Sequence, residues 1–122
     1  MANDKRDKKI YVSYIKDHKS IEELVGIYSL KPTTIKKIIK RISAKVDERN
    51  QFIEGLYEYT KSKYSKHFCT TLRNSLLRYV DYHDEYTLDG LIYSIKYHYI
   101  PNIGKQSLTV INEYIDSISE DK

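Results

Sequence analysis

The chain has no tryptophan and few of the residues that interrupt regular structure, with four glycines and two prolines among 122 residues. Sandwiches and barrels need many tight turns, and no alternating run of β-branched and aromatic residues bounded by Asn-Gly or Asp-Gly is present. Lysine, isoleucine, glutamate and leucine are abundant instead. The composition therefore predicts an all-α protein.

The chain also lacks an apolar stretch of about twenty residues, which a membrane-spanning helix requires. Its first ten residues, MANDKRDKKI, have no apolar middle of the kind found in signal peptides. A single cysteine, Cys69, excludes an internal disulfide and agrees with a reducing compartment. We therefore expect a cytoplasmic protein with no membrane partner.

Motifs of catalysis and cofactor binding are missing too. No glycine-rich nucleotide loop, nucleophile elbow or Ser/His/Asp arrangement is present, so we predict neither an enzyme nor a cofactor. Four residues that could be imagined as metal ligands are His67, Cys69, His83 and Asp84. They do not have the paired spacing of a zinc site, and no metal is expected.

An acidic cluster follows in the same region and consists of Asp81, Asp84, Glu85 and Asp89. Carboxylates can hold the divalent cation that a nuclease requires. The spacing of these four fits no defined cation motif, so a solvated loop is the favoured interpretation.

The most informative stretch is 20–41, which reads SIEELVGIYSLKPTTIKKIIKR. Ser20 is followed three residues later by Glu23, a spacing that predicts a capping box and a helix beginning at the next residue. Pro32 is tolerated at a first helical position but not in a helix interior. We therefore expect a turn over 29–31 and a second helix that starts at Pro32.

Each of these two helices is predicted to have one apolar face. The inward positions are Ile21, Leu24, Val25 and Tyr28 in the first helix and Ile35, Ile38, Ile39 and Ile42 in the second. The other face of the second helix carries Lys31, Thr33, Lys36, Lys37 and Lys40. Two apolar-faced helices joined by a short turn form the helix-turn-helix plan, in which the second helix enters a major groove.

The stretch resembles helix-turn-helix regulators and the promoter-reading region 4 of sigma factors. SIEELVGIYSLKPTTIKKIIK follows their pattern of Thr/Ser-Leu-Glu-Glu-Ile-Ala, a turn, and a Val or Ile in the next helix. It departs at Val25, where a small residue is usual, and at Ser29, where Gly is common. The resemblance implies that helix 32–41 reads the major groove of double-stranded DNA. The DNA-binding residues it implies are Lys31, Thr33, Thr34, Lys36, Lys37, Lys40 and Arg41.

Charge is distributed unevenly in a way that agrees with an anionic partner for this stretch. Residues 1–50 hold 13 Lys/Arg against 7 Asp/Glu, whereas residues 51–122 hold 8 against 10. Such a basic excess attracts nucleic acid. The alternative is a lysine face that is merely solvated. Since an isolated helix-turn-helix rarely reaches useful affinity, we also expect a homodimer or a second DNA-reading unit.

Four segments follow from the pattern along the chain. Residues 1–9 are almost without apolar side chains and are expected to form a flexible basic arm. Residues 10–45 form the helix-turn-helix unit, braced by a helix over 10–17 that turns Ile10, Tyr11, Tyr14 and Ile15 inward. Apolar density falls over 43–49, which is a short linker or an exposed helical turn. A connecting helix is predicted over 46–66 and a second compact unit over 67–122.

In the second unit, helices are expected over 70–78 and from Thr87 onward, with a break in the pattern over 79–86. Pro101 and Asn102 predict a turn after these helices. Gly104 is expected to permit a positive φ or a close approach, and Ser107 to start or cap the last helix. A glycine-containing hairpin that feeds backbone amides into a helix start can bind phosphate.

Residues 68–118 resemble the C-terminal domain of the bacterial RNA polymerase α subunit, a helical fold with a helix-hairpin-helix-like turn. That family's hairpin reads Asn-Leu-Gly-Lys-Lys-Ser-Leu, and this chain reads NIGKQSL from Asn102. The family's opening helix carries Arg-x-x-Asn-x-Leu, with Asn74 and Leu76 in register here. Thr71 stands at the family's arginine unless Arg73 substitutes for it. The resemblance implies a second DNA contact through Arg73, Asn74, Gly104, Lys105 and Ser107.

Two functions are therefore carried forward. The first is a DNA-binding transcriptional regulator of a bacterium, phage or plasmid. The second is a protein-interaction factor that binds RNA polymerase or a sigma factor without touching DNA, which the acidic second half favours. Six tyrosines could also stack on single-stranded bases, although half-buried tyrosines at the edge of a core are the simpler interpretation. They are Tyr79, Tyr82, Tyr86, Tyr93, Tyr97 and Tyr99.

Overall fold

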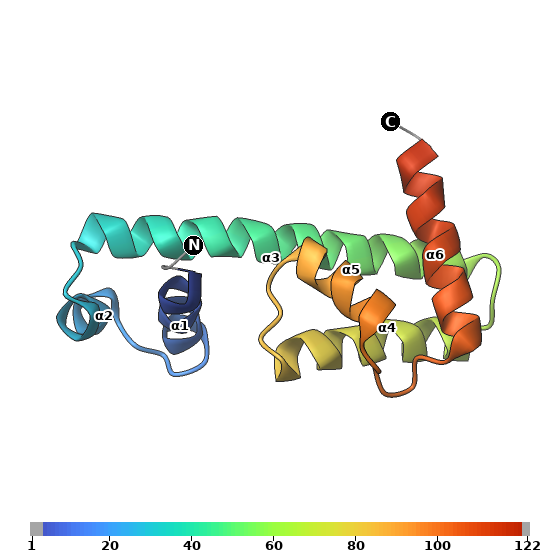
Figure 1. Cartoon of the computed structure of the whole chain (residues 1–122), viewed down its shortest axis with the longest axis horizontal. Helices are drawn as coiled ribbons and strands as arrows, with labels where there is room; N and C mark the ends of the chain where they lie inside the picture. Colours follow the sequence, from blue (N-terminus) through green and yellow to red (C-terminus); the bar gives the residue numbers. More distant parts are fainter. Residues whose placement is uncertain (1–3, 121–122) are drawn as a thin grey trace. The chain divides into compact units, whose positions relative to one another are not determined.

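The computed structural model describes residues 4–120 and confirms the all-α prediction, since those residues form helices and connecting turns with no strand (Figure 1). The helices are α1 (Asp4–Ile15), α2 (Ile21–Tyr28), α3 (Pro32–Lys61), α4 (Lys66–Tyr82), α5 (Leu88–Tyr97) and α6 (Lys105–Glu120). Residues 1–3 of the predicted arm and 121–122 of the predicted second unit lie outside the described residues. In the described part of the chain, no helix is both long and apolar enough to cross a membrane.

The chain divides into two compact units, Met1–Val46 and Asp47–Lys122, which we call the N-terminal and C-terminal units. The division falls inside α3, which contributes its first half to one unit and its second half to the other. The N-terminal unit holds 12 Lys/Arg against 5 Asp/Glu, and the C-terminal unit holds 9 against 12. The structural division therefore separates the charges more sharply than a division at residue 50.

In the N-terminal unit, α1 and α2 lie along the same side of the first half of α3 (Figure 1). Its buried apolar residues are Ile10, Tyr11, Leu24, Ile35, Ile38 and Ile42. The inward face predicted for the start of α3 is thus confirmed apart from half-buried Ile39. On the face predicted for α2 only Leu24 is buried, and the other three residues are half-buried. The prediction for α1 is partly wrong, because Tyr14 and Ile15 are 37% and 46% exposed.

The flexible arm predicted over 1–9 is wrong for residues 4–9, which belong to α1. Asp4 and Asp7 lie in the first turn of this helix, where a carboxylate interacts favourably with the positive end of the helix dipole. Asp7 is only 6% exposed and accepts hydrogen bonds from Arg6 and Arg41. Arg41 lies on α3, so the pair with Asp7 holds a polar segment against the unit, which apolar density alone does not predict.

Of the two interpretations of residues 43–49, the helical turn is confirmed and the short linker is wrong, and the connecting helix predicted over 46–66 is not a separate helix. The second helix does not stop at Arg41 but runs as α3 from Pro32 to Lys61, and the turn that follows ends at Ser65. Residues 33–54 contain neither Pro nor Gly, so nothing interrupts the backbone hydrogen bonds where the apolar residues become sparse. The small number of apolar residues over 43–49 therefore indicates that this part of α3 is largely exposed, not that the helix is interrupted.

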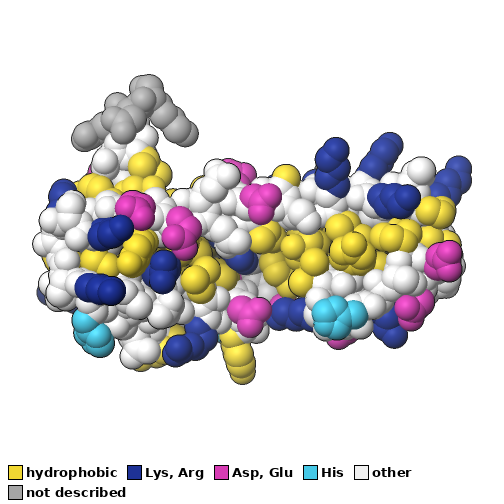
Figure 2. All heavy atoms as spheres, turned by 180° about the vertical axis from the view of Figure 1, so that it is seen from behind, with side chains coloured by type: hydrophobic (Ala, Val, Ile, Leu, Met, Phe, Trp, Pro, Cys, Tyr) yellow, Lys and Arg dark blue, Asp and Glu magenta, His cyan; other side chains and the backbone are white. Residues whose placement is uncertain are grey.

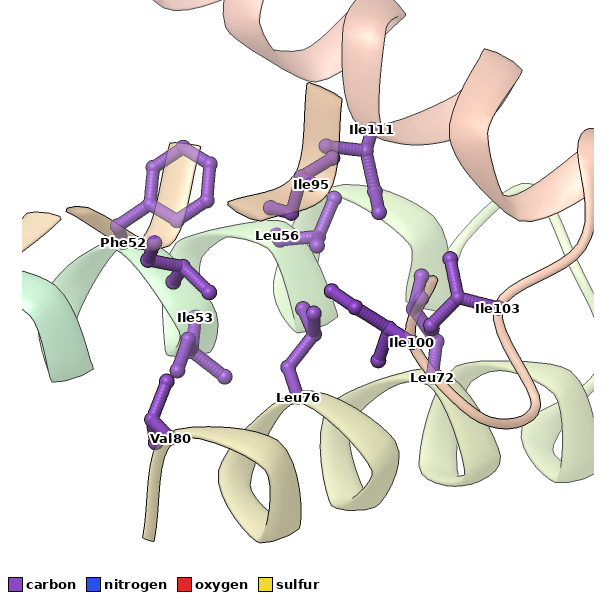
Figure 3. Packing of buried hydrophobic residues seen from close by; sticks show 11 residues of the cluster. Phe52, Ile53, Leu56, Leu72, Leu76, Val80, Ile95, Ile100, Ile103 and Ile111 are labelled. Carbon is purple, nitrogen blue, oxygen red and sulfur yellow. The ribbon is translucent and has the colours of Figure 1, made fainter. Parts of the chain in front are cut away.

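The C-terminal unit has the larger core, built from the second half of α3, from α4, α5 and α6, and from the loop before α6 (Figure 3). Figure 3 shows the side chains of α3 and α4 pointing toward one another, with Ile95, Ile100, Ile103 and Ile111 closing the cluster. The buried members are Phe52, Ile53, Leu56, Leu72, Leu76, Val80, Leu91, Ile95, Ile100, Ile103 and Ile111. The four helical segments and the loop before α6 thus contribute their apolar side chains to one cluster.

Two boundaries predicted in the C-terminal unit differ from those observed. The helix expected over 70–78 is α4, which begins after the cap Ser65 and continues through Tyr82. The break predicted over 79–86 is therefore wrong for 79–82, because Val80 continues the buried stripe of α4. The start of α5 after Thr87 is confirmed, with the Thr87 side chain accepting from the Gly90 N–H at 3.0 Å.

A buried arginine ties α3 to the loop before α5. Arg49 is 7% exposed and donates to the backbone carbonyl of Glu85 at 2.6 Å and to the side-chain oxygen of Asn50 at 2.7 Å. A charged group this buried needs such partners, since an unsatisfied one would cost several kcal/mol. Arg49 lies in the segment that the sequence assigns to a linker or exposed turn, and its burial is the feature that sequence pattern misses most clearly.

Candidate nucleic-acid interface

The helix-turn-helix stretch is held by the local interactions that its sequence predicts. The Ser20 side chain accepts from the Glu23 N–H at 3.1 Å, and the Glu23 carboxylate accepts from the Ser20 N–H at 3.2 Å, so the capping box is complete. The hydrogen bond to the Ser20 backbone N–H, with that to its side chain, lowers the pKa of Glu23. The carboxylate is thus kept in the ionised form that caps α2 best.

The turn between α2 and α3 has a left-handed residue at its first position. Ser29 adopts φ 56° and ψ 41°, and its N–H donates to the Val25 carbonyl at 2.9 Å. This is the position at which helix-turn-helix proteins commonly carry Gly. Ser29 thus adopts the left-handed conformation that Gly favours. The Lys31 carbonyl then accepts the Ile35 N–H at 3.1 Å, and Pro32 is the first residue of α3.

Five side chains at the start of α3 form what we call the lysine face, which consists of Lys31, Thr33, Lys36, Lys37 and Lys40. All five are exposed. Within 4–119, none of the four lysines has a hydrogen-bond or ion-pair partner. Figure 2 shows Lys and Arg side chains gathered along the first turns of α3, at the upper right.

The lysine face lies opposite the buried stripe of the same helix. At about 100° of rotation per residue, positions 33, 36, 37 and 40 fall within roughly 100° of arc, and positions 35, 38 and 42 lie on the far side. Beyond Lys45 the next exposed charged residues of α3 are Asp47 and Glu48. The basic surface is therefore confined to the first three turns or so of α3, about the length of helix that a major groove accepts.

Two other predicted DNA-binding residues on α3 are placed differently. Thr34 is half-buried, at the edge of the packed face. Arg41 pairs with the buried carboxylate of Asp7 at 2.5 Å. Its charge is thus already engaged, and its main role in the structure is to fix α1 on α3.

The predicted DNA-binding residues of the C-terminal unit differ from one another in how exposed they are and in whether they already have a partner. Arg73 lies 3.7 Å from the Glu54 carboxylate and stacks over the Tyr57 ring at 4.3 Å. Asn74 and Lys105 are exposed. Ser107 is 8% exposed, which is a poor position for contact with DNA.

The hairpin expected around Gly104 also differs in detail. The positive φ of 68° belongs to Asn102, and Gly104 has none. A side chain added at Gly104 would meet nothing within 4 Å, so no close approach requires glycine there. The Leu108 N–H donates to the Gly104 carbonyl at 3.0 Å, which makes Gly104 the cap of α6 and places Ser107 inside the helix. The prediction that Ser107 starts or caps this helix is wrong.

Among the residues that the structure describes, no group of three or more His, Cys, Asp or Glu side chains is arranged to hold a metal ion. Cys69 is buried at 1% exposure as a free thiol. Comparison with known proteins adds nothing to this picture, because no protein family, curated protein or solved structure matches the chain.

Proposed function

We propose that this protein binds double-stranded DNA through its N-terminal unit, with the first turns of α3 in the major groove, and that it acts as a transcriptional regulator in a bacterium, phage or plasmid. One observation carries the proposal. Three lysines of α3 without partners among residues 4–119 share an exposed face with Thr33, exposed Lys31 directly precedes the helix, and three of the four isoleucines between positions 35 and 42 are buried. An amphipathic helix of this kind after a short turn is the geometry of a recognition helix.

Each part of the lysine face has a role in the proposed complex. Thr33, Lys36 and Lys37 lie in the first two turns of α3 and contact base edges, whereas Lys31 and Lys40 at the two ends contact phosphates. The 12 Lys/Arg against 5 Asp/Glu in this unit would raise the association rate with any duplex. Sequence preference would then come from the contacts at the base edges.

The first prediction tests the lysine face by removing two of its charges. The variant Lys36→Ala/Lys37→Ala should bind a fluorescein-labelled A+T-rich duplex about tenfold more weakly at low salt. The slope of log affinity against log salt concentration should become less steep by roughly two, because each positive charge removed from the groove leaves about one fewer counterion displaced from the duplex, which is worth about 0.9 in the slope. Fluorescence anisotropy over a series of salt concentrations measures both quantities.

A matched control removes two charges elsewhere. Lys61→Ala/Lys96→Ala takes the same charge from exposed positions outside the lysine face and should leave the affinity and the slope nearly unchanged. If the two double variants lose affinity equally, the chain binds DNA only through its net charge. If neither loses affinity, the lysine face is not the site.

A second function is supported by a different observation. Arg73 is engaged by Glu54 and Tyr57, Ser107 is buried, and the C-terminal unit has an acidic excess of 12 against 9. These features favour the interaction factor that binds RNA polymerase or a sigma factor without DNA contact. Retention of the unmodified chain on immobilised polymerase, together with no anisotropy change on any duplex, would select this function over the first.

A further inference from the structure

The C-terminal unit contains a cavity of about 270 Å³ that neither proposed function uses. Its lining residues are Ser75, Arg78, Tyr79, Tyr82, His83 and Pro101. Four of the six, at spacings of three, four and seven from Ser75, come from one stripe of α4, and His83 is the residue that caps the end of this helix. Pro101, in the loop between α5 and α6, closes the other side.

The walls of this cavity are mostly rings. The His83 ring lies 4.3 Å from Tyr79 and 5.0 Å from Tyr82, measured between ring centroids. Tyr82 is 82% exposed, which is costly for a ring of that size and leaves its face free to cover a ligand. Ser75, at 7% exposure, is the most buried of the lining residues. Walls of this kind fit a flat apolar group, because aromatic rings stack face to edge or with an offset.

Arg78 is the only lining residue that carries a fixed charge. It is exposed and has no ion-pair or hydrogen-bond partner within the described residues 4–119, in contrast to Arg73, five residues earlier on α4, which is paired with Glu54. The carboxylates nearest in sequence, Asp81 and Asp84, do not line the cavity. The surface of the cavity is almost wholly apolar, so Arg78 lines it with its aliphatic stem and its guanidinium stands outside that lining. There a planar guanidinium is suited to a carboxylate or a phosphate that projects from the cavity, which it can bind through two parallel hydrogen bonds.

The geometry points to a binding site for a small aromatic anion, in which one ring carries a carboxylate or phosphate, the ring lies against Tyr79 and Tyr82, and the anionic group pairs with Arg78. The size agrees, since a dry cavity of about 150 Å³ can hold benzene and the additional volume accommodates a charged substituent. Single-stranded nucleic acid also offers rings and phosphates, but the acidic excess of this unit disfavours a polyanion. The inference is independent of DNA binding.

The second prediction uses the full chain and three probes that each carry one phenyl ring: benzoate, phenyl phosphate and neutral benzamide. When each probe is titrated into the ¹⁵N-labelled protein, the two anions should cause saturable changes in amide chemical shift. These changes should be confined to residues 75–83 and to the loop around Pro101. Benzamide should bind about tenfold more weakly than the anions, and Arg78→Ala should reduce benzoate binding to the level of benzamide. A preference for benzoate or for phenyl phosphate identifies which anionic group the site favours.

Exposed positions provide the controls, so the variants are expected to fold. Tyr82→Ala should weaken benzoate and benzamide alike, because it removes a ring wall and no charge. Lys96→Ala and Tyr97→Ala, both exposed and outside the lining, should leave binding unchanged. Three results would overturn the inference: equal benzoate binding by the wild type and Arg78→Ala, no saturable shift with any probe, or tighter binding of a single-stranded oligonucleotide than of phenyl phosphate to the same residues.

Discussion

Neighbouring cations on α3 have different roles, and the difference lies in what each one contacts. Lys37 and Arg41 are one turn apart, yet Arg41 is paired with the buried carboxylate of Asp7 and Lys37 has no partner among the described residues. From the sequence both belong to one basic face. Asp7 is 34 residues from Arg41, so only the folded N-terminal unit brings them together. Composition and periodicity predict that both side chains lie on the outer face of the helix. They do not predict which of the two forms an ion pair within the protein.

The third prediction concerns the left-handed residue in the turn. Ser29→Gly should raise the free energy of unfolding of the N-terminal unit by about 0.5–1 kcal/mol, because glycine adopts a positive φ without the steric cost of a Cβ. Urea unfolding followed through the NMR signals of α2 measures the change. DNA affinity should not change, since the turn already has this conformation.

Ser29→Ala is the matched control, because it keeps a Cβ at the left-handed position and removes only an exposed hydroxyl. Its stability should stay within about 0.5 kcal/mol of the wild type, as is usual for exposed substitutions. If Ser29→Ala raised the free energy of unfolding as much as Ser29→Gly, the left-handed backbone conformation of this residue would not be the cause of the increase.

At the level of helices, starts could be predicted from the sequence where a specific signal marks them, whereas α1, α4 and α6 begin before the residues at which the sequence placed their starts. Ser20 with Glu23, Pro32 and Thr87 each have a specific partner or a fixed φ, and the helices begin beside them as predicted. Helix ends depended on apolar density, which failed over 43–49 because the backbone continues wherever no Pro or Gly intervenes. The burial of Arg49 depends on a carbonyl 36 residues away, at Glu85, and could not be predicted from a local pattern.

One glycine sets the contact between α3 and α6, and the fourth prediction tests it. A glycine inside a helix usually only weakens it, but a Cβ at Gly55 would clash with the hydroxyl of Tyr114 and lie 3.2 Å from its Cζ. Tyr114 also packs at 5.4 Å from both Phe52 and Tyr59. Its partial burial raises the pKa of its hydroxyl. Gly55→Ala should lower the free energy of unfolding by about 1–3 kcal/mol, as overpacking usually does.

The control for this contact is a double-mutant cycle. In a Tyr114→Ala background the clash is absent, and Gly55→Ala should raise stability by up to about 1 kcal/mol through helix propensity. Chemical denaturation of the four proteins gives the coupling between the two sites. The same change in both backgrounds would show that the glycine is not needed for the packing of Tyr114.

For the whole molecule, the fold class could be predicted from composition, and the charge asymmetry could be read from the sequence. The structure places the change of sign at the division between the units, with 12 Lys/Arg against 5 Asp/Glu on one side and 9 against 12 on the other. The lysine face was predictable because its residues share one short helix segment. The aromatic cavity was not, since Pro101 comes from a loop 18 residues beyond His83.

The most direct test of DNA binding by α3 is site-specific cross-linking, which is the fifth prediction. Cys69 is 1% exposed and should not react, so Thr33→Cys can carry a thiol-attached photo-cross-linker as the single labelled site. On an A+T-rich duplex, this label should cross-link to bases, whereas a label at the exposed position Asn112→Cys in α6 should not. Cross-linking from position 112 with none from position 33 would contradict the proposal that α3 reads the major groove.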